Sequence, residues 1–240
     1  MLNPSLYEPI FTRKSVREYA DTPLSPAQLD AVREEIAKAV PLLPEEKYKL
    51  ELGEAREGWR IYGFCENTPK SNVNLGFLMQ QLDLALHIQG LGRLWFGFGR
   101  APSKLKAPAG LSYAMCLRIG VASEPIERAP GEFMRKPITE VVDEDALREL
   151  LDPVRLAPSA RNVQPWYFTA GTADKIFVWR KPPKIKLILD RMHWVDMGIA
   201  LCHMVLSLER KQVNFEISFD EAKRLEGYDY FMTVKRRAQL

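Results

Sequence analysis

Cysteine and histidine are scarce in this chain of 240 residues, with three of each. The cysteines are far apart and odd in number, so they provide neither a disulfide framework nor a zinc-ligand spacing. His87, His193 and His203 share no metal-ligand pattern, and ordinary helix positions account for them. The sequence therefore predicts reduced thiols, as in a cytoplasmic protein, and no metal site.

An excess of one charge and a long apolar run are also missing. Lys and Arg number 34 against 31 Asp and Glu, which gives a net charge of +3. So small an excess provides no electrostatic basis for nucleic-acid binding, although it allows a local basic pocket for an anionic ligand. The N-terminus has no apolar signal core, and polar residues interrupt every apolar stretch before it could span a membrane. We expect a soluble cytoplasmic protein with no nucleic-acid or membrane partner.

Apolar periodicity predicts the same order of elements twice along the chain. Helices are expected at Pro26–Val40, Asn74–Gln89, Asp145–Leu156 and Trp194–Arg210. Strands are expected at Trp59–Phe64, Leu94–Phe98, Tyr113–Val121, Trp166–Ala170, Lys175–Trp179, Val213–Phe219 and Tyr228–Val234. The polar, proline-containing segment Pro41–Gly58 is a candidate lid. The sequence thus predicts an α+β (mixed α/β) fold with two related halves, residues 1–138 and 139–240.

A short basic run precedes the first predicted helix. Arg13, Lys14, Ser15 and Arg17 place three cations and a hydroxyl within five residues. Guanidinium groups and a hydroxyl suit phosphate or another polar anion. In an extended segment, alternate side chains of this run point the same way. A solvated basic turn is the alternative, because short basic runs are common.

The segment Ala157–Trp166 lies between a predicted helix and a predicted strand. Its sequence, Ala-Pro-Ser-Ala-Arg-Asn-Val-Gln-Pro-Trp, offers backbone amides, two side-chain amides and a hydroxyl. Asn and Gln both donate and accept hydrogen bonds, so such a loop suits a planar ring with alternating donors and acceptors. The alternative is a helix end followed by a proline-rich connection.

Two further segments carry weaker signals. Glycines between Gly90 and Gly99 allow the backbone to approach a ligand, although their spacing fits neither a Rossmann fingerprint nor a P-loop. Taken alone, this segment is better explained by a helix stop followed by a glycine-containing strand. Arg135-Lys136-Pro137 is, by itself, only a basic pair.

Taken together, the four segments resemble the nitroreductase family of FMN-dependent oxidoreductases. The most specific match is Ala157–Trp166, which resembles the family's Ala-Pro-Ser-x-x-Asn-x-Gln-Pro-Trp motif. In a usual family member this motif follows soon after the basic N-terminal motif, but here about 140 residues separate the two. The family forms homodimers whose two FMN sites take residues from both chains. The sequence therefore resembles a fused form, a monomer acting as a pseudo-dimer with one FMN.

The resemblance also implies which residues bind the cofactor. A dianionic phosphate needs several donors and cations, and Arg13, Ser15, Arg135 and Lys136 are assigned to it and to the ribityl chain, with Lys14 as a neighbour. Arg17 is assigned to the pyrimidine edge of the flavin, where a cation favours the anionic reduced ring. The second half contributes Pro158, Ser159, Ala160, Asn162 and Gln164. A backbone amide within Gly97, Phe98 and Gly99 is expected near the reactive flavin nitrogen.

By the same resemblance, FMN carries the chemistry and the protein orients it. NAD(P)H is expected to pass a hydride to FMN and leave. A small-molecule electron acceptor, such as a nitroaromatic or a quinone, then takes the electrons in the same pocket. This ping-pong scheme requires no side-chain acid or base, so no catalytic residue is predicted. The alternatives are a flavin-binding or flavin-storage protein without reductase turnover, and a flavin-free interaction module.

Overall fold

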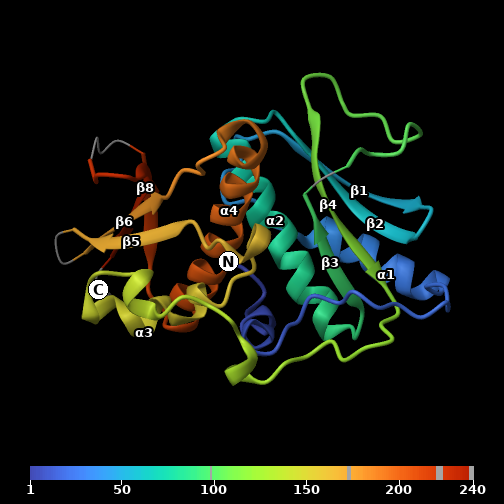
Figure 1. Ribbon diagram of the computed structural model, residues 1–240, viewed down its shortest axis with the longest axis horizontal. Coiled ribbons are helices and arrows are strands. Elements are labelled where there is room, and N and C mark those ends of the chain that lie inside the picture. Colours follow the sequence, from blue (N-terminus) through green and yellow to red (C-terminus); the bar gives the residue numbers. More distant parts are fainter. Residues whose placement is uncertain (98, 172–173, 220–223, 238–240) are drawn as a thin grey trace.

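Two four-stranded antiparallel sheets lie on opposite sides of a central pair of long helices (Figure 1). The computed structural model describes residues 1–97, 99–171, 174–219 and 224–237. The first half contains α1 (Pro26–Lys38), β1 (Tyr48–Ala55), β2 (Gly58–Cys65), α2 (Pro69–Ile88), β3 (Gly92–Phe96) and β4 (Ser112–Gly120). The second contains α3 (Asp145–Arg155), β5 (Trp166–Ala170), β6 (Lys175–Arg180), α4 (Lys186–Arg210), β7 (Phe215–Ser218) and β8 (Asp229–Arg236). These elements confirm the mixed α+β class.

The two halves have the same connectivity. The strand orders are β1-β2-β4-β3 and β5-β6-β8-β7, with antiparallel pairing throughout. The register shifts at corresponding places, between Gly63 and Phe64 in β2 and between Val178 and Trp179 in β6. One hydrophobic core cluster includes side chains from both sheets. The halves therefore share a single interior.

Helices α2 and α4 occupy the middle of this interior. Every residue of α2 from Ser71 to His87 is buried, and most of α4 is buried as well. A helix that is buried on all sides is apolar all round, so its sequence shows no single apolar stripe. A capping box of Thr68 and Ser71 begins α2, as Ser25 and Gln28 begin α1.

The two long helices cross with their backbones in contact. A Cβ atom added to Gly198 would overlap the carbonyl oxygen of Val73, and one added to Gly76 would overlap that of Val195. Each glycine lies three residues after the valine that the other glycine contacts. The crossing is therefore reciprocal, and only glycine leaves room for it at these two positions.

The prediction of a lid between Pro41 and Gly58 is wrong. Residues Tyr48–Ala55 form β1, which pairs with β2 from Tyr48 opposite Cys65 to Ala55 opposite Gly58. Charged residues alternate with Leu50 and Leu52, and Gly53 follows, so the strand lacks the apolar and β-branched composition that identifies strands. The segment belongs to the sheet and not to a cover over the site.

The other predicted elements are all present, with shifted boundaries. Helices α2 and α4 begin at Pro69 and Lys186, earlier than the predicted Asn74 and Trp194. The first turn of α2, Pro-Lys-Ser-Asn, carries no large apolar residue that would have extended the predicted pattern. Phe98, predicted as the end of a strand, lies outside the described residues. Within the described parts of the chain, no helix is both long enough and apolar enough to cross a membrane.

We predict that Gly198→Ala destabilises the protein by about 3 kcal/mol, the upper end for over-packing, because the added methyl meets backbone that cannot move aside. Urea unfolding monitored by circular dichroism measures the change. Gly131→Ala is the control, since a Cβ there has no neighbouring atom within 4 Å. Equal stability of the two variants would contradict the close crossing.

Candidate functional site

A cavity of about 290 Å³ lies where the two halves meet. Its walls come from five parts of the chain: the N-terminal segment, β3 with its following residue, β4, the loop after α3, and one side of α4. The lining residues are Ser15, Arg17, Leu94, Trp95, Phe96, Gly97, Met115, Pro158, Ser159, Ala160, Arg161, Leu189, Met192, Asp196 and Ile199. Neither half could form this cavity alone.

Six of the predicted site residues line the cavity, and they come from three of the four segments singled out in the sequence: Ser15, Arg17, Gly97, Pro158, Ser159 and Ala160. Gly97 lies against Met192, since a Cβ there would be 2.8 Å from Cε at the flexible end of that side chain. The other predicted residues are not among those that line the cavity: Arg13, Lys14, Gly99, Arg135, Lys136, Asn162 and Gln164. Phe98 lies outside the described residues.

The loop after α3 is held in an unusual backbone conformation. Arg161, Asn162 and Gln164 have φ angles of 52°, 57° and 50°, in the left-handed region that residues other than glycine rarely adopt. Each such residue costs free energy unless its surroundings hold it in place. Three left-handed residues within four positions therefore require specific contacts that hold the loop.

The basic pair at 135–136 supplies these contacts. Nη1 of Arg135 donates to Oδ1 of Asn162 at 2.7 Å, and the backbone N–H of Lys136 donates to Oε1 of Gln164 at 2.9 Å. Nζ of Lys136 donates to the carbonyl of Gln164 at 2.9 Å. The side-chain amides of Asn162 and Gln164 fix the loop to the preceding segment. Among the lining residues, the loop presents Pro158, Ser159, Ala160 and Arg161 to the cavity.

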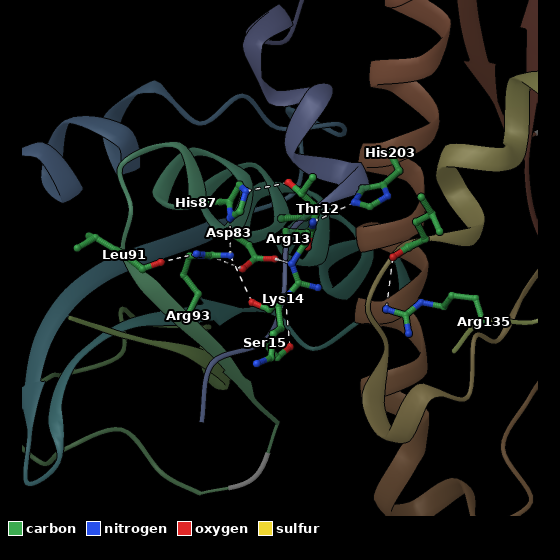
Figure 2. A network of polar contacts seen from close by, with 12 residues as sticks. Thr12, Arg13, Lys14, Ser15, Asp83, His87, Leu91, Arg93, Arg135 and His203 are labelled. Carbon is green, nitrogen blue, oxygen red and sulfur yellow. Dashed lines mark hydrogen bonds and ion pairs between the residues drawn. The ribbon is translucent and has the colours of Figure 1, made fainter. Parts of the chain in front are cut away.

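A buried ion cluster fixes the N-terminal segment beside the cavity (Figure 2). The carboxylate of Asp83 on α2 forms ion pairs with Nε of Arg13 at 2.9 Å and with Nε of Arg93 at 3.2 Å. Burial alone would raise the pKa of Asp83, but the guanidinium groups of Arg13 and Arg93 outweigh it and hold the pKa below its usual value. Nη2 of Arg13 also donates to Oγ of Ser15, which lines the cavity. Arg13 thus holds Ser15, the hydroxyl residue of the predicted basic motif, at the cavity wall.

The histidines near this cluster are uncharged. Burial, and then the charge of Arg93, lower the pKa of His87 to about 4. Its Nδ1 lies 3.1 Å from Nη2 of Arg93 and its Nε2 lies 3.1 Å from Oγ1 of Thr12. Since arginine can only donate, Nδ1 accepts and Nε2–H donates to the hydroxyl. No group of three possible metal ligands occurs within the described residues.

A second set of arginines lies next to Arg13. Burial, and then the charges of Arg13, Arg128 and Arg155, lower the pKa of Arg135 to about 10. Burial and then Arg13 also lower the pKa of Arg128. The Nε atoms of Arg128 and Arg135 are buried and have no hydrogen-bond partner in the described parts of the chain. This concentration of positive charge is suited to an anionic ligand.

Arg128 was not predicted from the sequence. It reaches the cluster because its segment pairs with the N-terminal segment: its backbone N–H donates to the carbonyl of Thr12 at 2.8 Å, and Glu127 forms a bridge with Arg13. A single arginine in an irregular segment gives no local signal. Lys14, by contrast, faces the other way and pairs with Glu124 at 2.5 Å.

Asp196 on α4 is the other residue that the sequence analysis missed. Its side chain lines the cavity, and its Oδ1 accepts a hydrogen bond from the backbone N–H of Ala160 at 3.0 Å. Its Oδ2 is buried without a partner among the described residues. Burial, unrelieved by any cation, raises the pKa of Asp196 to about 8. A carboxyl in the middle of an apolar helix was the signal that could have identified it.

We predict that Asp83→Asn destabilises the protein by about 3–5 kcal/mol, because Arg13 and Arg93 then remain buried without a counter-charge. The pKa of Asp83 is lower in the folded than in the unfolded protein, so its contribution is present above about pH 4 and is lost as the pH falls. Urea unfolding at pH 7 and at lower pH measures both effects. Asp30→Asn is the control, since the Asp30–Arg33 pair is exposed on α1. A change of less than 1 kcal/mol for Asp83→Asn would contradict this role.

Comparison with known proteins agrees with the resemblance in the sequence. A crystal structure from Thermotoga maritima, described as a nitroreductase, has a TM-score of 0.69 and 22% identity, covering 96% of this chain and 93% of that chain. An FMN-bound nitroreductase from Desulfitobacterium hafniense has a TM-score of 0.46 and 17% identity, covering 54% and 94% respectively. No curated protein sequence matches. The family model described as "Putative TM nitroreductase" matches residues 5–208, and the chain therefore belongs to this nitroreductase family.

Proposed function

We propose that this protein is an FMN-dependent NAD(P)H oxidoreductase that binds one FMN per chain at the cavity between its halves. The observation that carries the proposal is a group of arginines, one buried and two half-buried, beside a largely apolar cavity. Burial and then the charge of Arg13 lower the pKa of both Arg128 and Arg135, and Asp83 is the buried carboxylate that pairs with Arg13. A phosphate dianion is the kind of group that such a site favours.

The residues present fit an FMN molecule by their chemistry. The unpartnered Nε atoms of Arg128 and Arg135 are suited to phosphate, and Ser15, which accepts a hydrogen bond from Arg13, offers a hydroxyl at the cavity wall. Apolar side chains of β3 and α4, Leu94, Phe96, Met192 and Ile199 among them, suit the faces of a planar ring. The volume of about 290 Å³ lies near the lower end for small-molecule sites, which suits a ring whose phosphate extends toward the arginines.

When bound, FMN supplies the hydride chemistry. The chain's own residues orient the ring and keep water from it. Arg17 and Arg161 place positive charge at the cavity, which favours an electron-rich ring. Glycine at position 97 leaves the backbone accessible, since no Cβ covers it. The described cavity residues include no histidine, cysteine or lysine, and the proposed hydride step requires none.

We include NAD(P)H as the reductant and a planar, electron-poor compound, such as a nitroaromatic or quinone, as the acceptor. The apolar walls and the two lining arginines suit NAD(P)H and then the acceptor, which occupy the cavity one after the other in a ping-pong scheme. The three cysteines are buried and form no disulfide, which supports a cytoplasmic location.

We also propose that residues 1–138 and 139–240 stand in for the two subunits of a dimeric nitroreductase. The reciprocal contacts of Gly76 and Gly198 support this. So do two matching hydrogen bonds: Leu43 N–H donates to Oδ1 of Asn74 at 2.9 Å, as Ala160 N–H donates to Oδ1 of Asp196. Asn74 and Asp196 each lie two residues before the crossing glycine of their helix.

The residue that follows the third strand of each half explains why such a pseudo-dimer has one open site. Gly97 follows β3 and lies against Met192 on α4. The corresponding residue after β7 is Phe219, whose ring lies under Nζ of Lys70 on α2 at 3.9 Å. Met192 and Lys70 each lie three residues before the valine at the helix crossing. An aromatic ring thus occupies, in one half, the place that glycine leaves open in the other.

The proposal is tested by visible spectroscopy of the purified protein with added FMN, before and after anaerobic NADH or NADPH. We expect flavin absorbance that stays with the protein and bleaches on addition of the reductant. Bound flavin that is not reduced faster than free FMN would indicate a binding or storage protein. A protein that takes up no FMN would contradict the proposed function.

A second prediction concerns the phosphate. Arg128→Ala removes a charged donor, so it should weaken FMN binding by about ten- to a hundredfold, as expected for a charge-assisted hydrogen bond. Riboflavin has no phosphate, so its affinity should not change. Quenching of flavin fluorescence measures both dissociation constants. Arg33→Ala, on the exposed surface of α1, is the control. Equal losses for FMN and riboflavin would show that Arg128 does not contact the phosphate.

A further inference from the structure

The interior contains two buried aspartates in opposite electrostatic surroundings. Asp83 pairs with Arg13 and Arg93 and stays ionised. Asp196 is 3% exposed, and no cation pairs with it in the described parts of the chain. Its one hydrogen bond comes from the backbone of Ala160. An isolated carboxylate in such a place is unfavourable, so the neutral acid is the stable form.

The matching position in the first half shows what the local structure requires. Asn74 makes the same hydrogen bond to the backbone of its own half and is 0% exposed. A neutral amide is therefore sufficient to hold the loop that precedes the strands. Asp196 differs from Asn74 in that it can ionise and that it lines the cavity. The carboxyl thus adds a property that the fold itself does not need.

Few other charges act on Asp196. The loop contributes Arg161 and the N-terminal segment contributes Arg17, both at the cavity wall. Helix α2, packed along α4, has no ionisable side chain between Lys70 and Asp83. On β3, Arg93 is committed to Asp83. On α4 itself the nearest ionisable side chain is His193, whose pKa is lowered by burial, so it is neutral near pH 7.

We propose that Asp196 is a positioning residue that sets the upper pH limit for flavin binding: it is neutral when the cavity accepts the ring, and its ionisation weakens binding. This inference rests on the proposed function. An ionised Asp196 would place an unpaired negative charge in the wall beside an electron-rich ring. It would also attract Arg17 and Arg161, which otherwise face the ligand.

The raised pKa of Asp196, about 8, places this change just above neutral pH. If only the neutral form binds, the dissociation constant rises about tenfold for each pH unit above that pKa. In the free protein the same shift has a consequence for folding. Because the folded protein holds the proton more tightly than the unfolded one, stability decreases as the pH rises from about 4 to about 8.

The test compares FMN binding by the wild type, Asp196→Asn and Asn74→Asp between pH 6 and pH 9.5, measured by flavin fluorescence. We expect the wild-type dissociation constant to rise about tenfold from pH 7 to pH 9. Asp196→Asn should remain nearly constant, because the amide keeps the hydrogen bond and cannot ionise. Asn74→Asp introduces a carboxyl in the matching position away from the cavity, so its FMN binding should follow the wild type.

Parallel pH profiles for wild type and Asp196→Asn would overturn the inference while leaving FMN binding intact. Failure of the wild type to bind FMN at pH 6 would instead contradict the proposed function. A measurement without ligand also distinguishes a failure of this inference from a failure of the proposed function. Carboxyl ¹³C resonances of the wild type, assigned by comparison with Asp196→Asn, should show Asp196 titrating near pH 8. Titration of Asp196 near pH 4 would overturn the inference whatever the flavin result.

Discussion

The contact between the backbones of α2 and α4 is the constraint on which the rest of the structure depends. Gly76 and Gly198 allow the helices to approach without intervening side chains, and each half adds its sheet to this common axis. The distance between the halves is set here. Because the walls of the cavity come from α4, β3, β4, the N-terminal segment and the loop after α3, a change in this distance would alter all of them together.

Charge is distributed around this axis in two different ways. Beneath the N-terminal segment, Asp83 balances Arg13 and Arg93, so that the segment is held firmly and Ser15 is presented to the cavity. Next to it, Arg128 and Arg135 are half-buried, and burial and then the charge of Arg13 lower the pKa of each. The first arrangement is complete in itself, whereas in the proposed function the second is completed by the phosphate of FMN. Under that proposal, Arg13 and Arg93 stabilise the fold, and Arg128 and Arg135 bind the ligand.

Most of the fold could be predicted, because buried helices and strands leave apolar patterns that do not depend on distant residues. Strand β1 was missed because its exposed charges and Gly53 mask its alternation. In the site, Ser15, Arg17, Gly97 and Pro158–Ala160 were predicted to converge, and the structure brings them together. The direction of Asn162 and Gln164 was not predictable, since it depends on Arg135 and Lys136, which lie almost thirty residues earlier. Arg128 and Asp196 acquire their importance only from neighbours far along the chain.

The origin of the cavity walls in a single chain has a consequence for its behaviour in solution. In a dimeric site, dilution separates the two contributors, and the fraction of complete sites decreases with protein concentration. Here the contributors are covalently connected, so each remains at a high effective concentration relative to the other. The site therefore assembles to the same extent at nanomolar and at millimolar protein. A substitution in one half of this chain also leaves the other half unchanged, whereas a substitution in a homodimer is present in both subunits.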